Sequence, residues 1–152
     1  MHYYADSSAL VQRHIEEGGS VWVRTHLIVS PASLILTSDI SVVEIFSALN
    51  RRVREGTLTP TIYATLRADV VRLSVTTYQC IELSLAIRDR AAGLLEQHAL
   101  RAFDAIQLAS ALSAHEAIVN TDTGLLTFVS ADQRLLDAAR AERLVVINPN
   151  ER

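Results

Sequence analysis

The hydrophobic pattern of the chain alternates between two periods, one typical of strands and the other of helices. Short runs of aliphatic, β-branched and aromatic residues predict strands at residues 2–5, 34–37, 78–81, 126–129 and 144–147. Apolar residues that recur every three or four positions predict helices at residues 7–17, 21–28, 41–55, 60–73, 83–97, 101–116 and 131–141. Because strands and helices alternate along the chain, the sequence predicts an α/β fold around a mainly parallel sheet.

Glycine, proline and small hydroxyl residues mark where these helices begin and end. We expect Ser7 or Ser8 to cap the first helix. Gly56 suits the end of the helix at 41–55, and Pro60 suits the first turn of the next one. The chain has only five glycines and three prolines, with no interior linker or repeat, so we expect short loops and a single domain over residues 1–152.

Composition narrows the class of protein. Hydrophobic residues make up 49% of the chain and charged residues 20%, which is typical of a globular domain and not of a disordered segment. A single cysteine excludes a disulfide framework or a cysteine-based zinc site within one chain. No apolar run is long enough to span a membrane and the N-terminus has no signal-peptide pattern, so we expect no membrane span and a cytoplasmic location.

Four carboxylates stand at positions where a core residue or a helix cap is expected. Asp6 and Asp132 follow predicted strands, and ligands of parallel α/β sheets bind outside the carboxyl ends of strands. Glu44 and Asp104 interrupt apolar helical faces, where an unpaired buried charge is costly. Each acid also has a structural alternative, which is helix capping for the three aspartates and an ion pair with an arginine for Glu44.

These four acids predict a site for a hard divalent cation if the fold brings them together. Like charges that share a pocket raise one another's pKa, and a divalent cation removes that repulsion. Mg²⁺ and Mn²⁺ prefer oxygen ligands, and the five histidines show no metal-binding spacing.

The basic residues of the chain are all arginines. There are fourteen arginines and no lysine, and the net charge of −3 becomes +1 when the four acids are left out. Arg51, Arg52 and Arg54 lie just beyond Glu44 on the same predicted helix, where they could bind the phosphates of a polyanion. The alternative is a solvated helix C-terminus that the helix dipole stabilises. The next candidates for such a contact are Arg13, Arg101 and Arg134.

The four acids lie within four segments that follow one another along the chain. The segments are Y-A-D-S-S-A-L, S-V-V-E-I-F-S-A-L-N-R, L-R-A-F-D-A-I-Q-L-A-S-A-L and F-V-S-A-D-Q-R-L-L-D-A-A-R-A-E. In this order and spacing the chain resembles the PIN-domain ribonucleases, and more closely the VapC toxins of bacterial type II toxin–antitoxin pairs, from Tyr4 to Pro149. The resemblance implies a three-layer α/β/α sandwich whose central, mainly parallel sheet has four or five strands.

The resemblance also implies an activity, which is Mg²⁺- or Mn²⁺-dependent endonucleolytic cleavage of RNA. The acidic quartet that holds the metal and carries the reaction would be Asp6, Glu44, Asp104 and Asp132. Water would attack the phosphodiester in line, while one ion, or two ions about 4 Å apart, steadies the departing oxygen. Glu44 is either a ligand or the group that orients the water, and Ser8 and Ser130 are expected to hydrogen-bond the ligands.

Partners follow from the same resemblance, which implies a cognate antitoxin that inhibits the chain and a homodimer. Trp22, Ile28 and Leu34 could form a dimer or antitoxin groove, and packing against the core is the alternative. Two other functions stay open: a PIN-fold nuclease in RNA processing or DNA maintenance outside toxin–antitoxin systems, and a catalytically silent binding module. An aspartyl phosphatase fits less well, because D-S-S lacks the second aspartate of the usual D-x-D signature.

Two features depart from the family pattern. The segment 118–127 is longer than usual, and its Asp122 lies in T-D-T-G, which is typical of a turn rather than of a fifth acid. Arg143 stands where the family usually has glycine after the last helix, and a residue other than glycine there must adopt a costly left-handed conformation.

Overall fold

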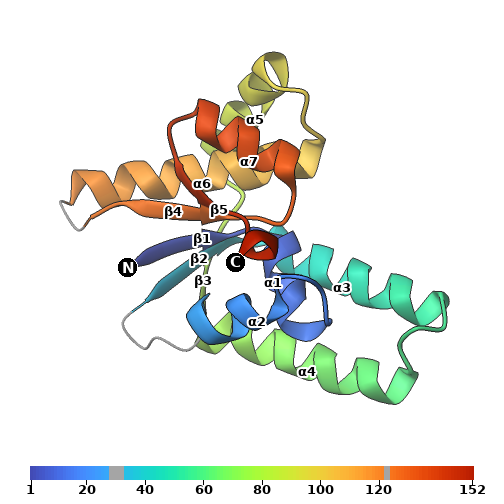
Figure 1. The fold of residues 1–152 in the computed structure, drawn as a ribbon. Helices are drawn as coiled ribbons and strands as arrows, with labels where there is room; N and C mark the ends of the chain where they lie inside the picture. The colour runs from blue at the N-terminus through green and yellow to red at the C-terminus, as the bar shows by residue number, and fades with distance from the viewer. Residues whose placement is uncertain (28–32, 122–123) are drawn as a thin grey trace.

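Within the residues that the structure describes, five parallel strands form one central sheet (Figure 1). The computed structural model describes residues 1–27, 33–121 and 124–152, so Ile28 and Asp122 lie outside it. The strand order is β3-β2-β1-β4-β5, and every neighbouring pair is parallel. The strands are β1 (His2–Ala5), β2 (Leu34–Ser38), β3 (Tyr78–Ile81), β4 (Leu126–Val129) and β5 (Val145–Ile147).

Helices cover both faces of the sheet, which gives the three-layer sandwich expected from the sequence (Figure 1). One layer consists of α5 (Leu85–Gln97), α6 (Ala102–Asn120) and α7 (Gln133–Ala141). The other consists of α1 (Ser7–His14), α2 (Ser20–Trp22), α3 (Ile40–Arg54) and α4 (Pro60–Thr76). A π-helical turn, η1 (Val23–Leu27), follows α2, and a 3-10 turn, η2 (Pro149–Glu151), follows β5. None of the helices in the described residues is long and apolar enough to cross a membrane.

Alternate residues of each strand belong to the two cores on either side of the sheet. Tyr4 pairs in register with Leu36 and Phe128, and all three side chains are buried in the core beneath α6. The rings of Tyr4 and Phe128 stack with their centroids 5.6 Å apart. Ala5 and Val129 also pair in register and belong to the opposite core. This period of two residues is why the short apolar runs form a sheet that is buried on both faces.

The first helix differs from the prediction at both ends. Asp6 caps α1, which is the structural alternative given for this acid, so Ser7 and Ser8 are not the cap; Oδ1 of Asp6 accepts a hydrogen bond from the backbone N–H of Ala9 in the first turn. The helix ends at His14, so the predicted extent to residue 17 is wrong. The helix predicted at 21–28 is the short α2 followed by the π-helical turn η1.

Trp22 and Leu34 are both half-buried and pack against the cores, as the packing alternative predicts. Leu34 also lines an open, mostly apolar pocket of about 480 Å³ between β2, β3 and α6. The ring of Trp22 also stacks on His26, with the centroids 5.7 Å apart. The large apolar side chains that are exposed among the described residues lie elsewhere, for example Val43 and Leu85.

Candidate active site

A polar cleft opens at the edge of the sheet where β1 and β4 end. It has a volume of about 560 Å³ and lies between α1, α3, the start of α6 and the segment that joins β4 to α7. The polar residues that line it include Ser8, Glu17, Glu44, Arg51, Arg101 and Asp132. Ligands of parallel α/β sheets bind at this edge, which makes the cleft the candidate active site.

Asp6 lies next to this cleft at the end of β1, and only 3% of the residue is exposed. Its carboxylate accepts hydrogen bonds from the N–H of Ala9 at 2.9 Å and from the hydroxyls of Ser8 and Ser130 at 2.8 Å. The pKa of Asp6 is raised to about 7, chiefly by burial and to a smaller extent by the charge of Glu44, while these hydrogen bonds lower it. A carboxylate has about four acceptor positions, so three donors leave room for one further ligand.

Asp132 and Asp104 each use one oxygen at a helix N-terminus. Asp132 Oδ1 caps α7 by accepting from the N–H groups of Arg134 at 2.8 Å and Leu135 at 3.2 Å. Asp104 Oδ2 accepts from the N–H of Arg101 at 3.4 Å, at the start of α6. The other oxygen of each aspartate accepts no hydrogen bond from any residue that the structure describes. Capping therefore leaves an oxygen of each side chain available for a ligand.

Glu44 reaches the cleft from α3. Its Oε2 accepts a hydrogen bond from the amide of Gln107 at 2.7 Å. Burial raises the pKa of Glu44 and so does the charge of Asp104, while hydrogen bonds from Gln107 and Ser7 lower it. Glu44 forms no ion pair with the described arginines, so the ion-pair alternative does not hold for it.

The four acids interact as neighbours in a row rather than as one tight cluster. Burial is the main cause that raises the pKa of Asp104, and the charge of Asp132 raises it further. Among the residues that the structure describes, no three acidic, histidine or cysteine side chains lie close enough together to hold a metal ion. The donor atoms are nevertheless all oxygens, and Asp6 has no ion pair with a described cation. This donor set fits a hard divalent cation.

The arginines predicted to bind RNA divide into two kinds. Arg51 lines the cleft, and so does Arg101, and neither forms an ion pair with a residue in the described part of the chain. Arg52 is instead held by Glu17, whose Oε1 accepts from its guanidinium at 2.6 Å. Arg51 and Arg101 are therefore available to an anionic ligand in the cleft.

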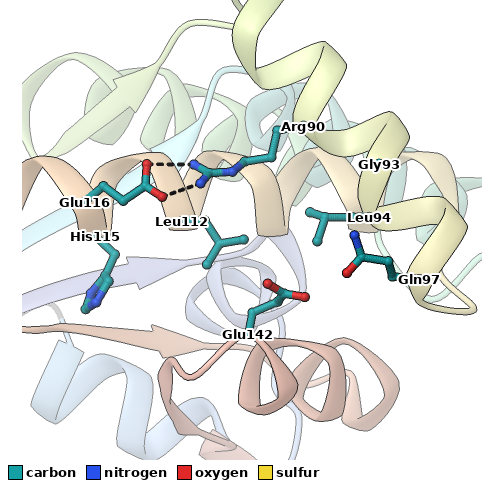
Figure 2. A pocket seen from close by; sticks show the side chains of 8 residues that line it. All are labelled: Arg90, Gly93, Leu94, Gln97, Leu112, His115, Glu116 and Glu142. Atoms are coloured by element: carbon teal, nitrogen blue, oxygen red, sulfur yellow. Dashed lines mark hydrogen bonds and ion pairs between the residues drawn. The ribbon is translucent and has the colours of Figure 1, made fainter.

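A second cavity, of about 440 Å³, lies between α5, α6 and the end of α7 (Figure 2). Its charged side chains already have partners. Arg90 donates to both carboxylate oxygens of Glu116, as the dashed lines in Figure 2 mark, and to Ser113 at 3.1 Å. Glu142 pairs with the ring of His98 at 2.7 Å. These contacts tie the helices to one another, which is a structural role.

Two residues of the cleft region are not among those predicted from the sequence. Gln107 is a polar residue inside the apolar run A-I-Q-L-A-S-A, and this pattern, which also marks Glu44 and Asp104, could have identified it. Phe103 lines the cleft and is 54% exposed. The sequence does not indicate that Phe103 is exposed, because a phenylalanine in the first turn of a helix usually faces the core.

The family model of the PIN domain matches residues 3–141, so the chain belongs to the PIN-domain family. PIN domains are generally nucleases and typically use divalent metal ions. An acidic, all-oxygen site at the carboxyl edge of the sheet agrees with that class. No curated protein sequence matches the chain.

Three solved structures share the fold of this chain. FitAcB from Neisseria gonorrhoeae superposes with a TM-score of 0.61 and 14% identity, covering 97% of each chain. FitAB bound to the IR36 DNA fragment superposes with a TM-score of 0.63 and 13% identity, covering 97% of this chain and 95% of that one. VapBC2 from Rickettsia felis, bound to a DNA fragment from its promoter, superposes with a TM-score of 0.59 and 15% identity, covering 97% of this chain and 98% of that one. At these identities the likeness is one of fold.

Proposed function

We propose that this PIN domain is a divalent-metal-dependent endoribonuclease and the toxin of a VapBC-type toxin–antitoxin pair. The observation that carries the proposal is the carboxylate of Asp6, which is buried beside Glu44 and has a pKa of about 7. A buried acid next to a second acid is costly for a folded protein. A cation that binds at the cleft would remove this cost, and strongly shifted groups in a cleft are typical of active sites.

Asp6, Glu44, Asp104 and Asp132 would hold Mg²⁺ or Mn²⁺, in part through bound water, because no three of these side chains lie close enough together to ligate one ion directly. A bound ion of this kind neutralises phosphate charge and lowers the pKa of water. The chain's own part is to fix the ligands. The hydroxyls of Ser8 and Ser130 hold the carboxylate of Asp6, and helix capping holds one oxygen of each of the other two aspartates.

The cleft also suits a single strand of RNA. Arg51 and Arg101 each offer a planar guanidinium, which binds phosphate bidentately. Phe103 offers its ring to the same cleft, and unpaired bases commonly stack on aromatic side chains. Arg52 would act on RNA binding only indirectly, because its guanidinium pairs with Glu17, which lines the cleft. We therefore expect cleavage of single-stranded RNA in preference to duplex RNA.

The toxin assignment is supported by the fold neighbours, which include the VapBC2 and FitAB toxin–antitoxin complexes. A cognate antitoxin would then bind this chain and inhibit it in the cytoplasm, and we expect the chain to form a homodimer. Expression of the chain alone should arrest growth, and coexpression of its antitoxin should restore it. Light scattering of the purified chain measures the expected dimer.

Cleavage of single-stranded RNA by the purified chain tests the activity. EDTA should abolish cleavage and added Mg²⁺ or Mn²⁺ should restore it, because every expected ligand is an oxygen. Asp104→Asn should abolish cleavage, since it removes a charged oxygen ligand from the proposed site. The matched control is Asp89→Asn, which changes an exposed acid on α5 that pairs with its neighbour Arg88. This control should keep the wild-type rate.

Other outcomes favour the alternatives. Full cleavage in EDTA would contradict the metal mechanism. RNA binding without cleavage at any metal concentration would favour a silent binding module. Metal-dependent cleavage without growth arrest would favour a PIN-fold nuclease outside toxin–antitoxin systems.

A further inference from the structure

A buried chain of hydrogen bonds runs beneath the cleft and ends on Glu44. Tyr4 of β1 donates its hydroxyl to Oε1 of Gln107 on α6 at 2.7 Å. The Nε2 of Gln107 donates to Ser41 Oγ at 2.8 Å and to Glu44 Oε2 at 2.7 Å, both on α3. Tyr4, Ser41 and Gln107 are each at most 1% exposed. The amide of Gln107 on α6 therefore links Tyr4 on β1 to the carboxylate of Glu44 on α3.

The carbonyl of Ala5 sets the direction of the hydrogen bonds in this network. Thr37 donates to the carbonyl of Ala5 at 2.7 Å, so its oxygen accepts from the hydroxyl of Ser41, 2.7 Å away. Ser41 then has its oxygen free to accept from Gln107. The second proton of the Gln107 amide is left for Glu44. With the hydrogen bonds arranged in this order, both amide protons of Gln107 and the hydroxyl protons of Ser41 and Thr37 have acceptors. Networks of this kind hold side chains rigidly.

Tyr4 fixes which way the amide of Gln107 faces. The hydroxyl of Tyr4 donates to Oε1 of Gln107 at 2.7 Å, so the oxygen of the amide faces Tyr4. If the amide were turned over, its oxygen would face the carboxylate of Glu44 with no proton between two acceptors. The hydroxyl on one side and the carboxylate on the other therefore both favour the observed orientation.

We propose that Gln107 is a positioning residue that fixes the carboxylate of Glu44 for metal binding, and that Tyr4 sets the orientation of its amide. This inference rests on the proposed function, because it assigns Gln107 a task at that site. A glutamate has three rotatable bonds, and a ligand that is free to rotate holds a metal poorly. Partners that orient metal ligands in this way typically contribute about 10–100-fold to metal affinity or activity.

Gln107→Met tests the inference, because it removes both amide donors at similar size. We expect kcat for RNA cleavage to fall about 10–100-fold, the KM for RNA to stay within about twofold, and Mn²⁺ affinity measured by calorimetry to fall about tenfold. The matched control is Gln12→Met. Gln12 is also 1% exposed, but its amide donates to Asn150 at 2.8 Å, away from Glu44. It should lose stability while keeping kcat and Mn²⁺ affinity.

A double-mutant cycle with Glu44→Gln separates positioning from packing. If Gln107 acts through Glu44, Gln107→Met should change neither kcat nor Mn²⁺ affinity further in that background. Equal losses in both backgrounds would overturn the inference. If Gln107→Met does not fold, Tyr4→Phe, which removes one hydroxyl, enters the same cycle with the same expectations. If the wild-type chain does not cleave RNA, the proposed function fails, and the Mn²⁺ affinities alone decide whether Gln107 positions Glu44.

Discussion

At the scale of single residues, Asp6 performs two tasks with one carboxylate. It caps α1 and belongs to the proposed metal site, and its pKa in the folded protein is about 7. In the unfolded chain an aspartate ionises near pH 4. Between about pH 4 and pH 7, Asp6 is therefore still protonated in the folded protein but ionised in the unfolded chain. Its contribution to stability is therefore present at low pH and is lost as the pH rises from about 4 to about 7.

Asp6→Asn should remove this loss, because the amide keeps an oxygen for the cap but carries no charge. In EDTA, the free energy of unfolding of the variant minus that of the wild type should grow by about 2–3 kcal/mol between pH 5 and pH 8. Urea denaturation at several pH values measures it. His14, whose pKa burial lowers to about 4, is common to both proteins and cancels in the difference. A difference that is constant with pH would mean that the buried acid is not strained.

At the scale of elements, the end of α7 carries a strained residue. Arg143 has a φ of 67°, the left-handed conformation that the sequence predicted for this position. Its N–H closes the last turn by donating to the carbonyl of Arg140 at 2.9 Å. Glycine adopts this conformation without the steric cost of a Cβ atom.

Arg143→Gly should therefore stabilise the protein. Relief of about 1–2 kcal/mol of steric strain, partly offset by the greater entropy of glycine in the unfolded chain, predicts a net gain of about 0.5–1 kcal/mol. Thermal unfolding measures it, with Arg143→Ala as the control that removes the side chain but keeps the Cβ atom. A gain shared by both variants would assign the effect to the lost charge instead.

The order and type of the elements could be predicted because strands buried on both faces and amphipathic helices have distinct periods. Their ends could not, because Asp6, Ser7 and Ser8 are all good caps and only tertiary contacts choose among them. Glu44 and Asp104 could be found because a charge in an apolar run is costly, and Asp6 and Asp132 because they follow strands. Gln107 is also a polar residue in an apolar run, but its hydrogen bonds to Tyr4 and Glu44 could not be predicted, since they depend on how β1, α3 and α6 pack.

At the scale of the whole molecule, positive charge flanks an acidic cleft in a chain whose net charge is −3. Arg51 lines the cleft, whereas Arg54, further along α3, is exposed and does not line it. Each phosphate contact on a single strand should contribute about −0.7 to the slope of log affinity against log salt. Only an arginine that touches the RNA contributes to that slope.

Arg51→Ala should weaken RNA binding and flatten the salt slope by about 0.7, because it removes one phosphate contact. Arg54→Ala is the matched control and should leave the slope unchanged. Both variants should keep the wild-type Mn²⁺ affinity, since neither arginine is a metal ligand. Salt-titrated fluorescence anisotropy gives the slopes. The RNA would have to follow another path if Arg54→Ala flattened the slope and Arg51→Ala did not.

The capping contacts of the acids have a consequence for how such a protein can change over evolution. Replacing Asp6 or Asp132 by alanine would remove a charge and also free the N-terminus of a helix, at a cost of about 1 kcal/mol. Asparagine or serine would remove only the charge. A lineage that abandoned the chemistry but kept the fold as a binding module is therefore expected to drift toward asparagine, serine or threonine at these positions. Such a descendant would keep its polar pattern and its shape, and only the missing negative charges would reveal that it has lost the proposed activity.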